Sequence, residues 1–185
     1  MTVNDSGEGR PRLILVLGGA RSGKSRYAQE MAETVKGKRL FVATAQAFDN
    51  EMTKRIEDHK RQRGDIWETR EEPVRIVEVI SESQKRYDVI LVDCLTLWVS
   101  NLLMAYGDDH ERVENHIQRL IEGLREAKTT IILVSNEVGL GIVPENRLAR
   151  AFRDLAGMVN QRVAEVADRV ILMVAGIPLV IKGSK

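Results

Sequence analysis

A short glycine-rich stretch near the N-terminus constrains this chain more than any other feature. Residues 18–25 read Gly-Gly-Ala-Arg-Ser-Gly-Lys-Ser and fit the pattern G-x-x-x-x-G-K-S. The apolar run Leu13–Leu17 precedes this stretch, and a helical pattern runs from Ser25 to about Lys36. Because glycine permits tight turns, the backbone N–H groups of such a loop can converge on phosphate oxygens. A strand, this loop and a helix in that order predict a phosphate-binding loop and disfavour a chance glycine turn.

The residues of the loop have distinct expected roles. The positive end of the following helix adds to the attraction that the loop amides exert on phosphate. We expect Lys24 to act as a catalytic group that reaches the β- and γ-phosphates of a nucleotide, and Ser25 to ligate Mg²⁺. The nucleotide contacts expected from the loop are Gly18, Gly19, Ala20, Arg21, Ser22, Gly23, Lys24 and Ser25.

A second candidate for the metal follows the apolar run Val89–Val92. This run ends in Asp93, and an acidic residue at the end of a buried strand can hold Mg²⁺ directly or through water. Strands also end in aspartate for ordinary capping reasons, so this assignment depends on the phosphate loop. The only cysteine, Cys94, comes next and is expected to be a small buried hydrophobe rather than a nucleophile.

Apolar runs alternate with helical patterns along the rest of the chain. Such runs are typical of parallel strands covered on both faces, and here they are Leu13–Leu17, Arg39–Thr44, Tyr87–Asp93, Thr129–Ser135 and Arg169–Val174. A last strand, Leu179–Lys182, follows Gly176–Pro178 as in a closing hairpin. We therefore predict an α/β, P-loop NTPase-like three-layer fold, with a mostly parallel central sheet and an antiparallel C-terminal strand. Residues 1–12 are expected to form a flexible tail, and residues 13–185 a single domain.

The last long helical pattern is the clearest of the predicted helices. Pro144 suits its first turn, because proline there loses no hydrogen bond. An apolar stripe at three- and four-residue steps is expected to face the core, and it consists of Leu148, Phe152, Leu155, Val159, Val163 and Val166.

Charge and hydropathy exclude several classes of protein. The 28 Lys and Arg residues against 27 Asp and Glu give a net charge of +1, which argues against a nucleic-acid binder. No apolar run approaches the roughly 20 residues of a membrane span, and residues 1–11 have no apolar signal region, so we expect a cytoplasmic protein without membrane insertion. The guanine-reading pattern N-K-x-D of signalling GTPases is absent, since the fourth strand leads into Ser135-Asn136-Glu137.

A charged helical pattern, Glu51–Arg63, contains a candidate nucleophile. Arg55, His59 and Arg63 follow at four-residue steps and so lie along one face of a helix. Neighbouring cations favour neutral imidazole, which is the nucleophilic form, and the same arginines could bind phosphate. On these residues alone, an ordinary exposed histidine stays the simpler interpretation of His59.

Together, the motifs of this sequence resemble the bifunctional adenosylcobinamide kinase / adenosylcobinamide-phosphate guanylyltransferase family of cobalamin biosynthesis. The resemblance covers most of the chain from Leu13 to Lys182. It is carried by GGARSGKS (18–25), Ala43-Thr44-Ala45, DNEMTKRIEDHKRQR (49–63), WETRE (67–71), Asp93-Cys94-Leu95-Thr96 and, most specifically, NEVGLGIVPENRLARAFRDLAGMVNQ (136–161).

The resemblance implies two successive reactions in one domain. ATP or GTP would phosphorylate the aminopropanol hydroxyl of adenosylcobinamide. GMP from GTP would then join that phosphate through a guanylyl-histidine, giving adenosylcobinamide-GDP and pyrophosphate. The histidine of the family's R-I-x-x-H pattern corresponds to His59 here. The resemblance also implies nucleotide contacts by Ala43, Thr44, Ala45, Lys60, Arg61, Gln62, Arg63, Glu71 and Asp93, and a homo-oligomer, specifically a trimer.

Two other functions remain open from the residues themselves. A simple small-molecule kinase would use the phosphate loop and leave His59 without a chemical role. A regulatory subunit would bind GTP tightly and turn nothing over. A covalent nucleotide on the protein would exclude both.

Overall fold

The strands and helices follow the order expected from the apolar runs. The computed structural model describes residues 12–46, 64–107 and 109–183. The strands are β1 Leu13–Gly18, β2 Arg39–Ala43, β3 Glu68–Glu71, β4 Val89–Asp93, β5 Thr130–Asn136, β6 Arg169–Val174 and β7 Ile177–Lys182. The helices are α1 Lys24–Glu33, α3 Ile76–Ser83, α4 Leu95–Tyr106, α5 His110–Arg125 and α6 Arg147–Val166, with a short 3₁₀ turn, η1, at Gly64–Ile66.

The strands form one seven-stranded sheet in the order β3-β2-β4-β5-β1-β6-β7. Neighbouring strands from β3 to β6 are parallel, and β7 alone pairs antiparallel, with β6. The predicted α/β fold, with its mostly parallel sheet and antiparallel last strand, is therefore confirmed. Strand β3 was not predicted, because its sequence, Glu-Thr-Arg-Glu, lies at an edge of the sheet and offers no apolar run.

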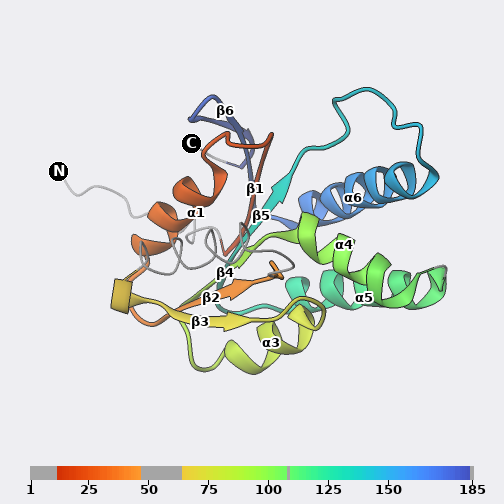
Figure 1. Cartoon of the computed structure of the whole chain (residues 1–185). Coiled ribbons are helices and arrows are strands. Elements are labelled where there is room, and N and C mark those ends of the chain that lie inside the picture. Colours follow the sequence, from red (N-terminus) through yellow and green to blue (C-terminus); the bar gives the residue numbers. More distant parts are fainter. Residues whose placement is uncertain (1–11, 47–63, 108, 184–185) are drawn as a thin grey trace.

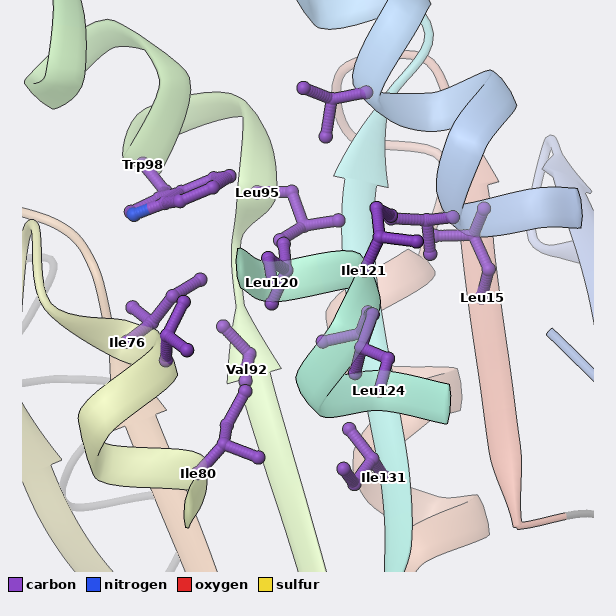
Figure 2. Close-up of a cluster of buried hydrophobic side chains, with 14 of the residues drawn as sticks. Leu15, Ile76, Ile80, Val92, Leu95, Trp98, Leu120, Ile121, Leu124 and Ile131 are labelled. Atoms are coloured by element: carbon purple, nitrogen blue, oxygen red, sulfur yellow. The ribbon is translucent and has the colours of Figure 1, made fainter. Parts of the chain in front are cut away.

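Helices cover both faces of the sheet and give the chain three layers (Figure 1). Helix α1 packs on one face, against β1, β4 and β5. Helices α3, α4, α5 and α6 cover the other face, where the larger of two apolar clusters lies. Figure 2 shows how side chains from α3, α4 and α5 meet those of the strands in this cluster, among them Ile76, Trp98, Leu120, Val92 and Ile131. The strand before the phosphate loop and the helix after it are thus both held by packing in the apolar clusters.

Helix α6 begins later than the sequence suggested. Its N-cap is Asn146, whose side chain accepts a hydrogen bond from Ala149 N–H at 3.1 Å, so Pro144 lies before the helix and not in its first turn. An asparagine cap satisfies a free N–H at the helix end, which proline cannot do. The expected stripe is buried at Val159 and Val163, but Leu148 is 66% exposed. Figure 1 gives the reason, since the first turn of α6 projects past the sheet.

Arg12, the last residue of the expected N-terminal tail, is hydrogen-bonded to the domain. Arg12 is held in place, since its N–H donates to the Asp168 carboxylate at 2.8 Å and its carbonyl accepts from Ile131 N–H at 2.6 Å. Residues 1–11 lie outside the described residues. Among the described helices, none is both long enough and apolar enough to cross a bilayer.

Replacing Trp98 should test how strongly the larger apolar cluster stabilises the fold. The Trp98 side chain is fully buried, and its indole N–H donates to the Val74 carbonyl at 2.7 Å. We expect Trp98→Ala to lower the free energy of unfolding by about 3–5 kcal/mol, because a large cavity and an unpaired carbonyl remain. The neighbouring Leu97 is partly exposed, so Leu97→Ala should cost less than about 1 kcal/mol. Urea unfolding measures the free energy of unfolding of both variants. Equal losses in the two variants would contradict the role assigned to Trp98 in the larger apolar cluster.

Candidate functional site

The phosphate loop, Gly18–Ser25, connects β1 to α1, as predicted. Gly18 has φ 151°, and a Cβ built there would lie 2.5 Å from the Met173 carbonyl oxygen on β6. Gly23 has φ 93° and forms the N-cap of α1. Both positions therefore require glycine, the first for close backbone approach and the second for its left-handed conformation.

Neighbouring strands hold the loop from two sides. On one side, Glu137 N–H, just past the end of β5, donates to the Gly18 carbonyl at 3.0 Å. On the other side, Gly176 N–H, in the turn between β6 and β7, donates to the Ser22 carbonyl at 3.0 Å. Within the loop, the Lys24 ammonium donates to the Gly19 carbonyl at 2.5 Å. These bonds fix the backbone path before any phosphate is bound, which reduces the entropy lost on binding.

Lys24 and Ser25 are the first two residues of α1, so their side chains lie at its positive end. Lys24 is 7% exposed, and burial lowers the pKa of its ammonium group, although the Asp93 carboxylate acts in the opposite direction. A partly desolvated ammonium interacts more strongly with phosphate charge than one surrounded by water. Ser25 is half-buried beside it.

Other predicted residues lie at the carboxyl ends of adjacent strands. Ala43 at the end of β2 pairs with Glu71 of β3 on one side and Asp93 of β4 on the other. Gly18 at the end of β1 pairs with Asn136 of β5. In an open parallel sheet, ligands bind outside this edge. The structure therefore brings the phosphate loop, Ala43, Glu71 and Asp93 to one edge of the sheet.

Thr44 has a structural role that was not expected. The Thr44 hydroxyl donates to the Cys94 carbonyl at 2.8 Å and accepts from Cys94 N–H at 2.7 Å. The Thr44 backbone N–H donates to the Asp93 carbonyl, and the Thr44 carbonyl accepts from the Asn101 amide at 2.8 Å. Thr44 is fully buried. Its polar groups are thus engaged inside the protein, where they position Asp93 and Cys94.

A second buried network joins α4, β5 and α6 beneath the same edge. The Thr96 hydroxyl lies 3.1 Å from the Ser135 hydroxyl and accepts from Asn136 N–H at 2.6 Å. The Asn160 amide donates to the Asn136 carbonyl at 3.1 Å. The sequence signal for this network is the presence of polar residues inside otherwise apolar segments, which does not identify their partners. The network fixes the start of the segment that follows β5.

Ser25 and Asp93 form a donor set that suits Mg²⁺. Mg²⁺ in nucleotide sites takes one or two protein oxygens and completes its shell with phosphates and water. A hydroxyl at the start of α1 and a carboxylate at the end of β4, next to Lys24, meet that need. Within the described ranges, no group of three or more His, Cys, Asp and Glu side chains could hold a metal ion by itself.

The expected nucleophile and its neighbours are not among the described residues. These are His59, Lys60, Arg61, Gln62 and Arg63, together with the rest of the charged helical pattern Glu51–Arg63. Of the other histidines, His116 lies on α5, and its Nε2 is 3.1 Å from the Tyr106 hydroxyl at the end of α4.

Cys94 should be unreactive and should make stability fall at high pH. Burial, with a smaller effect of Asp93, raises the pKa of its thiol from 9.0 to about 11. The folded state therefore keeps this proton above pH 9, where the unfolded chain loses it, so this contribution to stability disappears between pH 9 and 11. From pH 8 to 10.5, we expect the free energy of unfolding to fall about 2 kcal/mol more in wild type than in Cys94→Ala. Urea unfolding of both proteins at both pH values measures this difference. An equal fall in the free energy of unfolding of wild type and Cys94→Ala would contradict the raised pKa of the thiol.

Solved structures support the fold. An ATPase from the type III secretion system of pathogenic bacteria is 12% identical, with a TM-score of 0.54 over 88% of this chain and 51% of that one. A structural-study target from Pyrococcus horikoshii is 11% identical, with a TM-score of 0.55 over 96% of this chain and 89% of that one. At these identities the likeness concerns the fold alone.

Sequence relatives are much closer than these structures. A bifunctional adenosylcobalamin biosynthesis protein, CobP, of Pseudomonas aeruginosa is 45% identical over 91% of this chain and 96% of its own length. The corresponding CobU proteins of Escherichia coli and Salmonella typhimurium are 42% and 44% identical, each over 92% of this chain and 99% of their own length. The model of the family described as cobinamide kinase / cobinamide phosphate guanyltransferase matches residues 14–181. The resemblance inferred from the motifs is thereby confirmed, and the chain belongs to the cobinamide kinase / cobinamide phosphate guanyltransferase family.

Proposed function

We propose that this chain catalyses two successive reactions on one corrinoid substrate. It phosphorylates the aminopropanol hydroxyl of adenosylcobinamide with ATP or GTP, and then transfers GMP from GTP to the new phosphate. The products are adenosylcobinamide-GDP and pyrophosphate. The observation that carries the proposal is the phosphate loop with Lys24 beside Asp93, in a chain that matches the family over residues 14–181.

In the first reaction the protein mainly positions charge. The substrate hydroxyl oxygen attacks the γ-phosphorus, the bond to the β–γ bridging oxygen breaks, and the hydroxyl proton leaves to water. Loop amides and the Lys24 ammonium hold the phosphate oxygens in line and neutralise the charge of the departing nucleoside diphosphate. Ser25 and Asp93 would hold Mg²⁺, which neutralises further phosphate charge when bound.

In the second reaction we assign the nucleophile to His59. Its imidazole attacks the α-phosphorus of GTP, and the bond to pyrophosphate breaks, leaving a guanylyl-histidine. A phosphate oxygen of adenosylcobinamide phosphate then attacks the same phosphorus, and the phosphorus–nitrogen bond breaks. Arg55 and Arg63 each lie four residues from His59 in the sequence. Their positive charges favour the neutral imidazole that this attack requires.

Partners and location follow from the same resemblance. We propose contacts to the nucleotide by Ala43, Ala45 and Glu71, and by Lys60, Arg61, Gln62 and Arg63 around the histidine. We also propose that the protein acts as a trimer in the cytoplasm, where nucleoside triphosphates are available. Light scattering of the purified protein gives its mass in solution and would overturn the trimer if it showed a monomer.

His59→Ala should abolish the covalent intermediate. With Mg²⁺ and GTP labelled at the α-phosphate, and without acceptor, wild type should form protein-bound label that is acid-labile and base-stable. We expect the variant to form none and to lose guanylyl transfer by roughly 1000-fold or more, because the nucleophile is gone. It should still phosphorylate adenosylcobinamide.

His116→Ala is the matched control and should retain the label, because His116 lies on α5, where it contacts Tyr106 of α4 and not the phosphate loop. Absence of label in wild type that binds GTP would overturn the histidine intermediate and favour the simple kinase.

Lys24→Ala should impair phosphorylation through the loss of one cation at the phosphate oxygens. We expect kcat/KM of the kinase reaction to fall about 100- to 1000-fold. Lys36→Ala is the matched control, because Lys36 lies exposed beyond the end of α1 and should leave the rate unchanged. Measurement of nucleoside diphosphate release with adenosylcobinamide tests both variants. Equal rates for Lys24→Ala and Lys36→Ala would show that Lys24 has no role in the kinase reaction.

A further inference from the structure

A groove between α4 and α6 has a mainly apolar lining. Its volume is about 320 Å³, and its lining includes Leu103, Met104, Leu148, Phe152, Ser100 and Asn146. The lining consists of apolar side chains and two neutral polar ones, and none is charged. Met104 is 65% exposed and Leu148 is 66% exposed, so apolar area stays open to water. Such a lining suits an organic ligand with alkyl and amide groups better than it suits a nucleotide.

The groove is joined to the phosphate loop by the segment 137–146, which Figure 1 shows as the long connection between β5 and α6. The first N–H of this segment donates to the Gly18 carbonyl at 3.0 Å, and its last residue, Asn146, lines the groove. Within the segment, Leu140 is 87% exposed and Ile142 is 97% exposed. Uncovered apolar side chains are therefore present along the chain between the phosphate loop and the groove.

Helix α4 sets the distance between the groove and the edge of the sheet. Thr96, in its first turn, accepts a hydrogen bond at 2.6 Å from the N–H of Asn136, which pairs with Gly18 at the start of the phosphate loop. Ser100 and Met104 follow four and eight residues later, on the same face of the helix. At a rise of 1.5 Å per residue, they lie about 6 and 12 Å along α4 from Thr96. The groove is thus one to two helical turns from the edge where the phosphate loop begins.

We propose that this groove binds the corrin ring of adenosylcobinamide while the aminopropanol hydroxyl reaches the phosphate loop. The inference rests on the proposed function, which names this acceptor. An arm of roughly seven consecutive bonds, including an amide, joins the hydroxyl to the ring and spans about 8 Å when extended, as two to three residues do. This reach matches the distance from the groove to the edge of the sheet. The alkyl groups of the ring cover Met104 and Leu148, and its amide side chains face Ser100 and Asn146.

The acceptor and the nucleotide then approach the phosphate loop from different sides. The proposed nucleotide contacts Ala43, Glu71 and Asp93 end the strands β2, β3 and β4. The groove belongs to the layer opposite α1, in which α4 packs on β5 and α6 packs on β1. In-line transfer requires the attacking oxygen to stand opposite the leaving oxygen. An acceptor on the α4–α6 side and a nucleotide along the β4–β2–β3 edge are compatible with that requirement.

Kinetics of two double variants test the site. We expect Met104→Ala/Leu148→Ala to raise the KM for adenosylcobinamide in the kinase reaction about tenfold, because apolar contact area is lost. The KM for ATP, and protein labelling by GTP without acceptor, should stay as in wild type. Leu179→Ala/Ile181→Ala is the matched control and should change none of these quantities. Its two side chains are also apolar and each 55% exposed, but they lie on β7 at an edge of the sheet.

A variant that fills the groove gives an independent measurement. Ser100 is half-buried in the lining, so Ser100→Trp places an indole where the corrin ring is proposed to lie. Equilibrium dialysis detects the corrinoid by its visible absorbance. We expect this variant to bind adenosylcobinamide about tenfold or more weakly, because the indole occupies the cavity. Unchanged binding of Mg-GTP to the same variant shows that it remains folded.

Three results would overturn the corrin site in a protein whose wild type binds and phosphorylates adenosylcobinamide. Unchanged KM and unchanged dialysis in the groove variants would show that the ring lies elsewhere. Equal weakening of corrinoid and nucleotide binding would mean that the groove only supports the phosphate loop. A lower mass of Met104→Ala/Leu148→Ala in solution, with unchanged corrinoid binding, would assign the groove to a second copy of this chain. If wild type neither binds nor phosphorylates adenosylcobinamide, the proposed function fails together with this site, and that result is distinct from the other three.

Discussion

The site depends on the close approach of the Gly18 backbone to β6. At φ 151°, and with the Met173 carbonyl where a Cβ would have to go, only glycine can stand at the end of β1. This contact lets the chain leave the sheet at once and turn back into α1. Lys24 and Ser25 then begin the helix at the same edge where Asp93 ends β4. Lys24, the helix dipole and the acidic strand end therefore meet at the edge of the sheet where this contact turns the chain.

Buried polar groups keep the neighbouring strand ends in place. Thr44 satisfies both the N–H and the carbonyl of Cys94, and Asn101 ties the Thr44 carbonyl to α4. Thr96 and Asn160 do the same for Asn136 at the end of β5. A backbone group left unpaired at these buried positions would cost about 1–3 kcal/mol, so each side chain stabilises one chain path over its alternatives. Buried polar side chains thus determine where Asp93 and the segment after β5 lie.

The sequence predicted those parts of the molecule whose signal is contiguous. The loop residues and Asp93 could be assigned because each belongs to a short motif beside an apolar run, and strands buried on both faces show such runs clearly. Strand β3 was missed because its residues lie at the polar edge of the sheet. The start of α6 was misplaced because the cap of Asn146 prevails over a nearby proline. The role of Thr44 and the contact of the β6–β7 turn could not be predicted, since their partners are 50 or more residues away.

The same arrangement is compatible with the proposal that one loop serves two transfers. Loop amides, a lysine and a helix dipole interact with phosphate charge and not with a particular phosphorus atom, so under the proposed function they would stabilise a departing nucleoside diphosphate or a departing pyrophosphate equally well. What must differ is the nucleophile and the position of the nucleotide along the loop.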